Sequence, residues 1–347
     1  MPSIHTVRGA VDTADLGVTL MHEHVFVLSS DMQQNYSAEW GSEDARVDDA
    51  VRRLTVAYEA GVRTIVDPTV VGMGRYIPRI ARIAERVPLQ LVVATGLYTY
   101  NDLPFYLRHR GPAPDRLGGK GTDPLVEMFV SDIRDGIGGT GVKAGMLKCA
   151  VDAPGITLGV ERVMRAVARA HHETGVPITV HTHADSGSGL EVKRVMCVEE
   201  GVDPGRIVLA HSGDTTDLEY LTALGDAGFV LGMDRFGLNL DTPFEARADT
   251  LIEMVRRGYT GRMVLSQDAN CYIDWMEPAV REAVLPQWHY THLFDDVFPY
   301  LLDRGIEQRQ IDMMLVDVPR AFFEGRPAPI PSMYTTISSP GRLFSAR

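Results

Sequence analysis

Short apolar segments rich in β-branched residues recur along the whole chain, and each has the length of a buried strand. There are eight of them, at residues 18–26, 64–71, 90–98, 144–152, 177–184, 207–213, 229–237 and 263–270. Helical patterns lie between them, at 47–61, 159–175 and 217–228, and these end in glycine just before the next segment. Strands that alternate with helices indicate βαβ units and therefore a parallel sheet.

The number and spacing of these repeats predict how the sheet closes. Eight strand–helix repeats over about 250 residues are typical of a closed (β/α)8 barrel. The alternative is an open doubly wound sheet, but its phosphate-binding GxGxxG loop after the first strand is absent. We therefore expect an α/β fold, a (β/α)8 TIM barrel, in one domain at residues 1–325. A Pro- and Ser-rich tail is expected to follow at 326–347.

Charge and cysteine content narrow the class of protein. A net charge of -12 argues against nucleic acid or a membrane as partner, because both attract a basic face. The three cysteines form no CxxC pair, so neither a disulfide framework nor a thiolate zinc site is expected. The N-terminus has no signal-peptide core, and no apolar run has the length of a membrane span. We expect a cytoplasmic protein.

Side chains that can bind metal ions occur on five of the eight segments, at or near their C-terminal ends. His22 and His24 are two residues apart, a spacing that places both on the same face of a strand, here the barrel interior. The C-terminal ends of barrel strands form the catalytic face. The set comprises His22, His24, Lys148, His181, His211 and Asp268, and His183 shares the strand face of His181.

Each of these residues alone has an ordinary structural explanation. A buried histidine can be hydrogen-bonded in the core, a lysine can extend to water, and an aspartate can cap a helix. Together they would place many polar groups in one apolar interior, which is costly unless the groups are paired. A shared metal centre removes that cost, and so the six residues predict a metal site.

Lys148 indicates two metals rather than one. Burial and nearby cations would depress the pKa of its amine. The neutral amine can react with CO₂ to form a carbamate, N6-carboxylysine, whose two oxygens can bridge two divalent ions. The carbamate, Asp268 and a bridging hydroxide would leave the pair of ions with residual positive charge, which suits polarising a carbonyl or phosphoryl oxygen.

These segments resemble the amidohydrolase superfamily and, within it, the phosphotriesterase family with its phosphotriesterase-like lactonases. The resemblance covers roughly residues 1–325. The metal-binding part of the match lies in MHEH, AGMLKCA, PITVHTHA, VLAHSGDTTDLEYL and SQD. The lactonase part lies in GLYTYNDLPFY (96–106), LGMDRFGLNL (231–240), SQDANCYIDW (266–275) and DVPRAFFEG (317–325).

The resemblance implies a role for each metal-binding residue. His22, His24 and Asp268 would hold the more buried ion, and His181 and His211 the more exposed one, with carboxylated Lys148 between them. It selects His181 over His183 as the ligand, a choice that spacing alone leaves open, and places His183 in the pocket. It implies two divalent ions, zinc foremost, with Co, Mn and Fe as alternatives. It also implies a homodimer.

Further residues are expected around the reacting atoms. The resemblance implies that Tyr98 hydrogen-bonds the substrate oxygen or the hydroxide, and Arg235 is predicted to lie near Asp268 and orient the site. Asp268 can take a proton from the hydroxide and pass it to the leaving alkoxide. The long loops at 27–46, 99–130 and 271–292 follow strand ends. The loops after the third and eighth segments contribute apolar and aromatic side chains suited to an acyl chain, among them Tyr100, Phe105, Tyr272 and Trp275.

These expectations converge on a metal-dependent, quorum-quenching lactonase. Its substrates would be N-acyl-homoserine lactones or other lactones with a hydrophobic tail, attacked at the carbonyl by a metal-bridging hydroxide. Organophosphate hydrolysis is expected as a side activity. A dedicated phosphotriesterase is the alternative within the same fold, and a barrel that binds ligands without catalysis is the alternative from another class.

Overall fold

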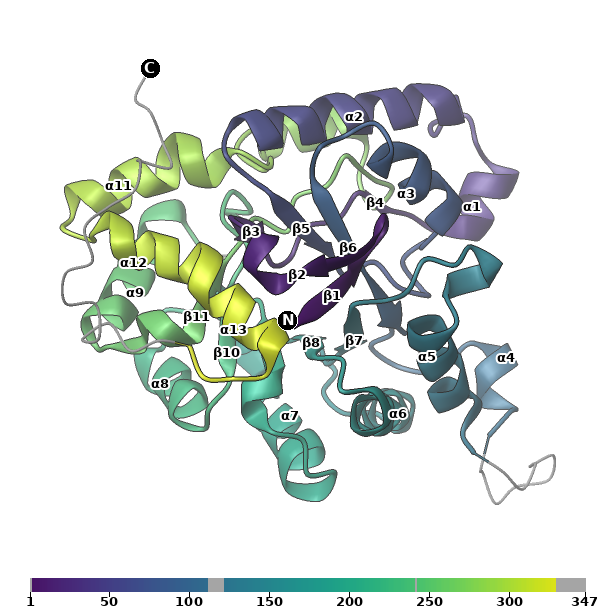
Figure 1. The fold of residues 1–347 in the computed structure, drawn as a ribbon. Coiled ribbons are helices and arrows are strands. Elements are labelled where there is room, and N and C mark those ends of the chain that lie inside the picture. Colours follow the sequence, from purple (N-terminus) through teal and green to yellow (C-terminus); the bar gives the residue numbers. More distant parts are fainter. Residues whose placement is uncertain (1, 112–121, 241, 329–347) are drawn as a thin grey trace.

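A sheet of eight parallel strands forms the centre of the molecule (Figure 1). The structure is a computed structural model, and it describes residues 2–111, 122–240 and 242–328. The strands follow one another around the sheet in chain order. They are β3 Thr19–Leu20, β5 Thr64–Asp67, β6 Gln90–Gly96, β7 Met146–Ala150, β8 Ile178–His181, β9 Ile207–Ala210, β10 Val230–Met233 and β11 Met263–Leu265.

The first and last strands approach each other just beyond their ends. Asp268 N donates to His22 O at 3.1 Å, and His24 N donates to Ala269 O at 2.8 Å. Farther along, β4 (Phe26–Val27) pairs in parallel with β12 (Tyr272–Ile273). The sheet therefore curls into a nearly closed barrel, and with the surrounding helices it confirms the predicted (β/α)8 TIM barrel.

Helices surround the barrel, and helical segments separate successive barrel strands (Figure 1). The longer ones are α2 Glu43–Glu59, α3 Ile77–Ala84, α5 Pro124–Arg134, α6 Leu158–Thr174, α8 Leu218–Asp226 and α9 Phe244–Arg256. The shorter ones are α1 Ser30–Asn35, α4 Phe105–Arg108, α7 Ser188–Val192, α10 Pro278–Val284, α11 Phe298–Asp303, α12 Gln308–Asp312 and α13 Val318–Glu324. None of the helices in the described ranges is both long and apolar enough to cross a bilayer.

Local sequence explains where these helices start, stop and face, as α6 illustrates. The Thr157 hydroxyl accepts a hydrogen bond from Val160 N and so caps the first turn. Val160, Val163 and Val167 recur at helical spacing and are buried. Gly175 ends the helix in a left-handed conformation with φ of 74°. The predicted helix at 159–175 therefore lies within one residue of the observed one.

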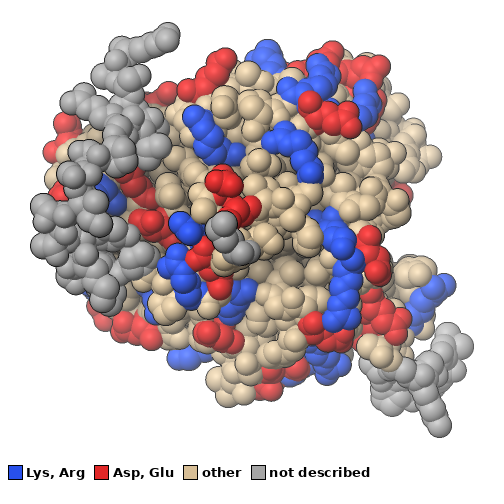
Figure 2. Space-filling model, in the orientation of Figure 1, with Lys and Arg blue, Asp and Glu red and all other residues tan. Residues whose placement is uncertain are grey.

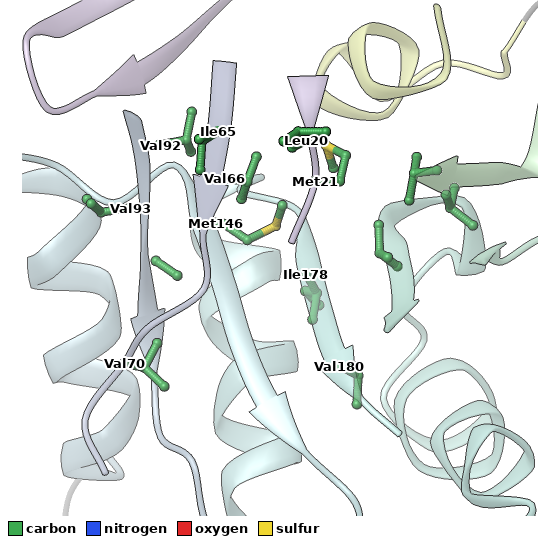
Figure 3. Packing of buried hydrophobic residues seen from close by; sticks show 14 of the residues in the cluster. Leu20, Met21, Ile65, Val66, Val70, Val92, Val93, Met146, Ile178 and Val180 are labelled. Atoms are coloured by element: carbon green, nitrogen blue, oxygen red, sulfur yellow. The ribbon is translucent and has the colours of Figure 1, made fainter. Parts of the chain in front are cut away.

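Branched side chains and methionines fill the space between the strands. Figure 3 shows side chains of this cluster, including Leu20, Ile65, Val92, Met146 and Ile178, packed between neighbouring strands. Each of these five side chains has essentially no solvent exposure. Burial of one such side chain contributes about 1.5–3 kcal/mol, so the cluster makes the barrel a firm support for the residues at its rim.

An antiparallel hairpin, formed by β1 (Ser3–Thr6) and β2 (Gly9–Asp12), lies at the N-terminal end of the barrel and was not predicted. Val7 N donates to the carbonyl of Leu91, near the start of β6, at 2.8 Å. In Figure 1 the hairpin lies in front of the barrel strands. Figure 2 shows the same face, where basic and acidic side chains are interspersed. The opposite end of the barrel is left for the polar side chains.

The strands are shorter than predicted at that opposite end. The predicted strand 18–26 is divided into β3 and β4, and the predicted strand 64–71 ends at Asp67. The predicted strand 207–213 ends at Ala210, because His211 has φ of 65° and leaves the extended ladder. Several predicted site residues therefore lie just beyond a strand rather than in it. Of the predicted tail at 326–347, residues 329–347 are outside the described residues.

Replacing Gly96 with alanine is expected to destabilise the barrel beside Lys148. Gly96 pairs with Lys148 across β6 and β7 and has φ of 149°, and an added Cβ would lie 1.8 Å from the Lys148 carbonyl oxygen. Overpacking and the unfavourable φ together should cost about 3 kcal/mol or more. The measurement is the midpoint of thermal unfolding.

Gly175→Ala is the matched control for this prediction. Gly175 also has a positive φ, of 74°, but an added Cβ would meet no heavy atom within 4 Å. Gly175→Ala should therefore lose only the stability that alanine costs in a left-handed backbone conformation, about 1–2 kcal/mol. Equal unfolding midpoints for the two variants would contradict the close contact at Lys148.

Candidate metal centre

Four buried histidines gather at the C-terminal end of the barrel. The rings of His22 and His211 have centroids 4.8 Å apart, those of His181 and His211 4.5 Å apart, and those of His22 and His24 5.5 Å apart. Each side chain comes from a different strand end except His22 and His24, which both follow β3. The parity argument for that pair predicts a shared face, and the structure places both rings in the same cluster.

Asp268 and Lys148 complete the predicted set. Asp268 Oδ1 is 3.4 Å from His24 Nε2 and 3.6 Å from His22 Nε2. Lys148 Nζ is 3.5 Å from His22 Nε2 and is fully buried within β7. The structure thus brings all six predicted residues together, although 246 positions separate the first from the last in the sequence of 347.

The donor atoms fit a divalent metal ion. One ligand atom each from His22, His24 and Asp268 lies within 4.8 Å of the other two, and all three residues are buried. Imidazole nitrogen and carboxylate oxygen are the donors that zinc and related ions prefer. A second group with the same property comprises His22, His211 and Asp234.

Asp234 is better placed to orient the histidines than to bind an ion. Its Oδ1 accepts a hydrogen bond from His211 N at 2.8 Å and lies 3.0 Å from His211 Nδ1. Its Oδ2 lies 3.3 Å from His22 Nδ1. Both oxygens therefore face the rear nitrogens of the two rings, which directs the Nε2 atoms toward the shared space.

A carboxylate also lies near one ring nitrogen of each of the other two histidines. His24 Nδ1 is 2.7 Å from Thr69 Oγ1 and 3.5 Å from Asp67 Oδ1. His181 uses the opposite nitrogen: its Nε2 is 2.6 Å from Asp152 Oδ2, which leaves Nδ1 for the site. Metal-binding histidines commonly carry such a carboxylate partner, which fixes the tautomer.

Sequence reasoning missed these three carboxylates. Asp67 ends β5, Asp234 follows β10 directly, and Asp152 lies two residues beyond β7. The signal that identified the histidines, a polar side chain at the C-terminal end of a strand, would also have identified them. What the sequence does not contain is the pairing of each carboxylate with a particular ring nitrogen.

Burial sets the protonation states in this cluster. It lowers the pKa of His181 to about 4 and that of His211 well below its usual value, so both rings are neutral at pH 7. Neutral imidazole is the form that binds metal. Burial also lowers the pKa of Lys148 to about 8, so that part of the population is uncharged near neutral pH.

The pKa values of Asp268 and His24 are shifted against the effect of burial. Burial alone would raise the pKa of Asp268, but the charges and hydrogen bonds of His22, His24 and Arg235 hold it well below its usual value. Burial opposes protonation of His24, yet Asp268 and Asp67 raise its pKa. Asp268 is therefore a carboxylate ready to bind a cation.

Arg235 lies where the sequence predicts, beside Asp268. Its Nε donates to Asp268 Oδ2 at 3.0 Å, and its Nη1 donates to Asp214 Oδ2 at 2.8 Å. Arg247, which has almost no exposed surface, donates to the other oxygen of Asp214 at 2.6 Å. This chain of ion pairs holds one oxygen of Asp268 in place, and neither Asp214 nor Arg247 was singled out from the sequence.

Two tyrosines pack against His181. The Tyr98 hydroxyl is 2.9 Å from that of Tyr100 and 3.5 Å from His181 Nδ1. The Tyr98 ring lies 5.1 Å from Tyr100 and 5.3 Å from His181, centroid to centroid. Burial raises the pKa of Tyr98, so its hydroxyl remains a proton donor at any physiological pH.

The remaining predicted pocket residues lie apart from these contacts. His183 accepts a hydrogen bond at Nδ1 from Ser186 N, 3.3 Å away in its own turn. Tyr272 is buried against Trp40, and its hydroxyl donates to Glu39 at 2.7 Å. These contacts bury the Tyr272 side chain, and its substrate contact stays a prediction. Trp275 and Phe105 are exposed on their loops.

A parallel barrel with buried histidines, an aspartate and a lysine at the C-terminal ends of its strands is the architecture of a metal-dependent hydrolase. The sequence matches the family model described as "Phosphotriesterase family" over residues 2–323. The chain therefore belongs to the phosphotriesterase family, whose members are binuclear metal hydrolases.

Individual relatives agree with this assignment. A "Phosphotriesterase homology protein" of Mycobacterium tuberculosis is 52% identical over 324 residues, which cover 93% of this chain and 98% of that protein. An "Aryldialkylphosphatase" of Saccharolobus solfataricus is 38% identical over 318 residues, covering 91% of this chain and 98% of that protein. The solved structure of the phosphotriesterase from Mycobacterium tuberculosis superposes with a TM-score of 0.91 at 51% identity, covering 94% of this chain and 100% of that one.

Replacing Asp234 with asparagine is expected to weaken metal binding about 10–100-fold, the range typical when the outer partner of a ligand histidine is lost. The amide can accept from only one of the two rings that the carboxylate contacts. Metal content after dialysis against graded chelator concentrations measures the effect.

Asp123→Asn provides the control for that substitution. Asp123 is also buried, and it binds Arg162 Nε at 2.7 Å in an ion pair between α5 and α6. The Asp123→Asn substitution should lower thermal stability and leave metal content unchanged. If both variants keep wild-type metal affinity, Asp234 does not orient metal ligands.

Proposed function

We propose that this protein is a lactonase whose main substrates are N-acyl-homoserine lactones with hydrophobic acyl chains, and that organophosphate triesters are slower, secondary substrates. The observation that carries the proposal is the Tyr98 hydroxyl, 3.5 Å from His181 Nδ1 and 2.9 Å from the Tyr100 hydroxyl. It places a proton donor beside the predicted metal ligands.

The two tyrosine rings also restrict the shape of the substrate. The Tyr98 ring lies edge-on to Tyr100 and to His181, and the Tyr100 ring is tilted relative to His181, so aromatic surface fills that side of the site. A lactone presents a planar carbonyl carbon, whereas a phosphotriester presents a tetrahedral centre with three bulky substituents. A site narrowed on one side favours the planar group, and a fixed hydroxyl donor favours an ester oxygen.

The proposed ligands divide between two ions. His22, His24 and Asp268 would hold one ion and His181 and His211 the other, with N6-carboxylated Lys148 between them. When bound, the two divalent ions, zinc foremost or Co, Mn or Fe, would lower the pKa of water and polarise the acceptor oxygen. The burial of Lys148 and its pKa of about 8 support carboxylation, since the reaction with CO₂ requires a neutral amine.

Other side chains would bind the substrate and move the proton. The Tyr98 hydroxyl would donate a hydrogen bond to an oxygen of the lactone. As hydroxide adds to the carbonyl carbon and the ring C–O bond breaks, Asp268 would accept the proton of the hydroxide at Oδ2 and deliver it to the departing ring oxygen. Oδ1 is less suited, since it faces the ring nitrogens of His24 and His22. Arg235 cannot relay that proton, because guanidinium stays charged, and its role is to hold Oδ2 in place.

The acyl chain would extend toward the loops that follow β6 and β11. Trp275 and Phe105 are exposed on these loops and offer apolar surface at the rim of the barrel. Loop 99–130 includes residues 112–121, which lie outside the described residues. A homodimer is part of the same proposal and follows from the resemblance to the lactonases, and a cytoplasmic location is proposed with it.

A dedicated phosphotriesterase is the second candidate, because the relatives named above carry the names phosphotriesterase and aryldialkylphosphatase. The two functions differ in relative kcat/KM for a long-chain acyl-homoserine lactone and for paraoxon. We expect the lactone to be preferred. A clear preference for paraoxon would establish the second candidate.

Tyr98→Phe separates the two substrates further. Loss of the hydroxyl should lower kcat/KM for the lactone about 100-fold, the usual effect of removing a donor from the transition state, and lower it less for paraoxon. Tyr100→Phe is the control, since it removes a hydroxyl that binds Tyr98 while keeping the ring. Equal losses for both substrates would refute a lactone-specific role of Tyr98.

Lys148→Ala should lose bound metal and activity together, because alanine cannot form the bridging carbamate. Short-chain carboxylic acids added to the variant are expected to restore part of both, by occupying the place of the carbamate. Metal analysis and lactone turnover, with and without the acids, measure the effect. Full activity of Lys148→Ala without added acid would show that the lysine does not bridge the ions.

A further inference from the structure

Glu23 is a fully buried carboxylate that has no part in the site as described so far. It lies between His22 and His24, and its side chain bonds to the backbone of Gln267 and Ala269 and not to the histidine cluster. Its side chain has no exposed surface.

Those two hydrogen bonds come from the residues on either side of Asp268. Gln267 N donates to Glu23 Oε1 at 2.7 Å, and Ala269 N donates to Glu23 Oε2 at 2.6 Å. Asp268 N between them donates to His22 O. Three consecutive backbone N–H groups around Asp268 are therefore held by two consecutive residues of the first strand region.

Glu23 itself is held firmly from the other side. Its own backbone N–H donates to the Val66 carbonyl in β5 at 3.0 Å, and the Ser266 hydroxyl accepts from His22 N at 2.9 Å. Backbone groups of residues 22 and 23 thus connect the segment after β3 to β5 and to the segment after β11, and the Glu23 carboxylate adds the bonds to Gln267 and Ala269.

The segment that Glu23 holds contains an unfavourable backbone conformation. Asp268 has φ of 53°, and His211 and Asp268 are the non-glycine residues with positive φ among the described part of the chain. Such a conformation is unfavourable for a residue with a side chain and persists when its surroundings leave no alternative. Hydrogen bonds to both neighbours of Asp268 supply that constraint.

We propose that Glu23 is a positioning residue, whose carboxylate fixes the peptide units on both sides of Asp268 and so holds the Asp268 side chain against His24 and Arg235. The inference rests on the role proposed above for Asp268 as metal ligand and proton carrier. The consequence is specific: loss of Glu23 should loosen one metal ligand and one proton-transfer group while leaving the substrate-binding tyrosines unchanged.

The competing explanation is that Glu23 serves barrel closure alone. In that case its removal lowers the stability of the fold without changing metal affinity or turnover in the folded protein. The two explanations predict different effects on metal affinity, on kcat and on KM. A change in stability alone leaves these quantities unchanged in the folded protein.

Glu23→Gln in the full chain tests the proposal. Glutamine has the same size but only one acceptor oxygen. Its NH₂ group would face the backbone N–H of either Gln267 or Ala269, so one of the two hydrogen bonds would be lost. Metal affinity is measured by competition with a chelator, and kcat and KM are measured at saturating metal with both a lactone and paraoxon. We expect metal affinity and kcat to fall about 10–100-fold, the range for an outer partner, with KM changed less than about twofold.

Glu324→Gln is the matched control. Glu324 is a mostly buried glutamate in α13 that accepts from the Thr13 hydroxyl at 2.7 Å and from Arg320 at 2.9 Å, near the N-terminal hairpin. The same chemical change there should leave metal affinity and kcat as in the wild type. Should Glu23→Gln fail to fold, Glu23→Asp, one methylene shorter and able to reach only one N–H, is measured in the same way.

Wild-type metal affinity and kcat in a folded Glu23 variant would overturn the proposal and leave Glu23 a closure residue. A rise in KM alone would overturn it as well, because it would indicate a substrate contact. Failure of the lactonase proposal can be told apart from failure of the Glu23 proposal. Metal affinity is measured without substrate, and kcat is measured with paraoxon as well as with the lactone.

Discussion

Closure of the barrel between the segments after its first and last strands is the constraint on which the rest of the site depends. Residues 22–24 and 266–269 are more than 240 positions apart, yet they exchange backbone and side-chain hydrogen bonds. Both segments carry predicted metal ligands, so the contact that closes the sheet also assembles half of the metal centre. Stability of the fold and geometry of the site therefore share the same hydrogen bonds at this seam.

Burial creates an electrostatic problem at this rim, and carboxylates behind the histidines resolve it. Asp234, Asp67 and Asp152 each accept from or lie close to the rear nitrogen of a buried ring. Because each ring then has one nitrogen committed, the other is directed toward the shared space in a defined tautomer. The rings of His22, His181 and His211 have lowered pKa values, so the site is prepared for cations before any ion binds.

Much of the barrel and the six-residue cluster could be predicted, for reasons that are local. Alternation of strand and helix patterns identifies the βα repeats, and the two-residue spacing of His22 and His24 places both on one face. The N-terminal hairpin escaped prediction because its four-residue strands have no clear apolar alternation. The contacts of Tyr272 with Trp40 and Glu39 also escaped prediction, because they join residues far apart in the chain.

The sequence by itself determined which elements form, which end of the barrel carries the polar side chains and which family the residues resemble, because those properties depend on periodicity and on residues near one another in the chain. Only the tertiary structure decided which carboxylate meets which imidazole nitrogen, where His211 and Asp268 leave their strands, and that Glu23 holds both neighbours of Asp268. These features depend on atoms that are distant in the chain, and the pairing of neighbouring strands together with the closure of the barrel brings those atoms within hydrogen-bonding distance.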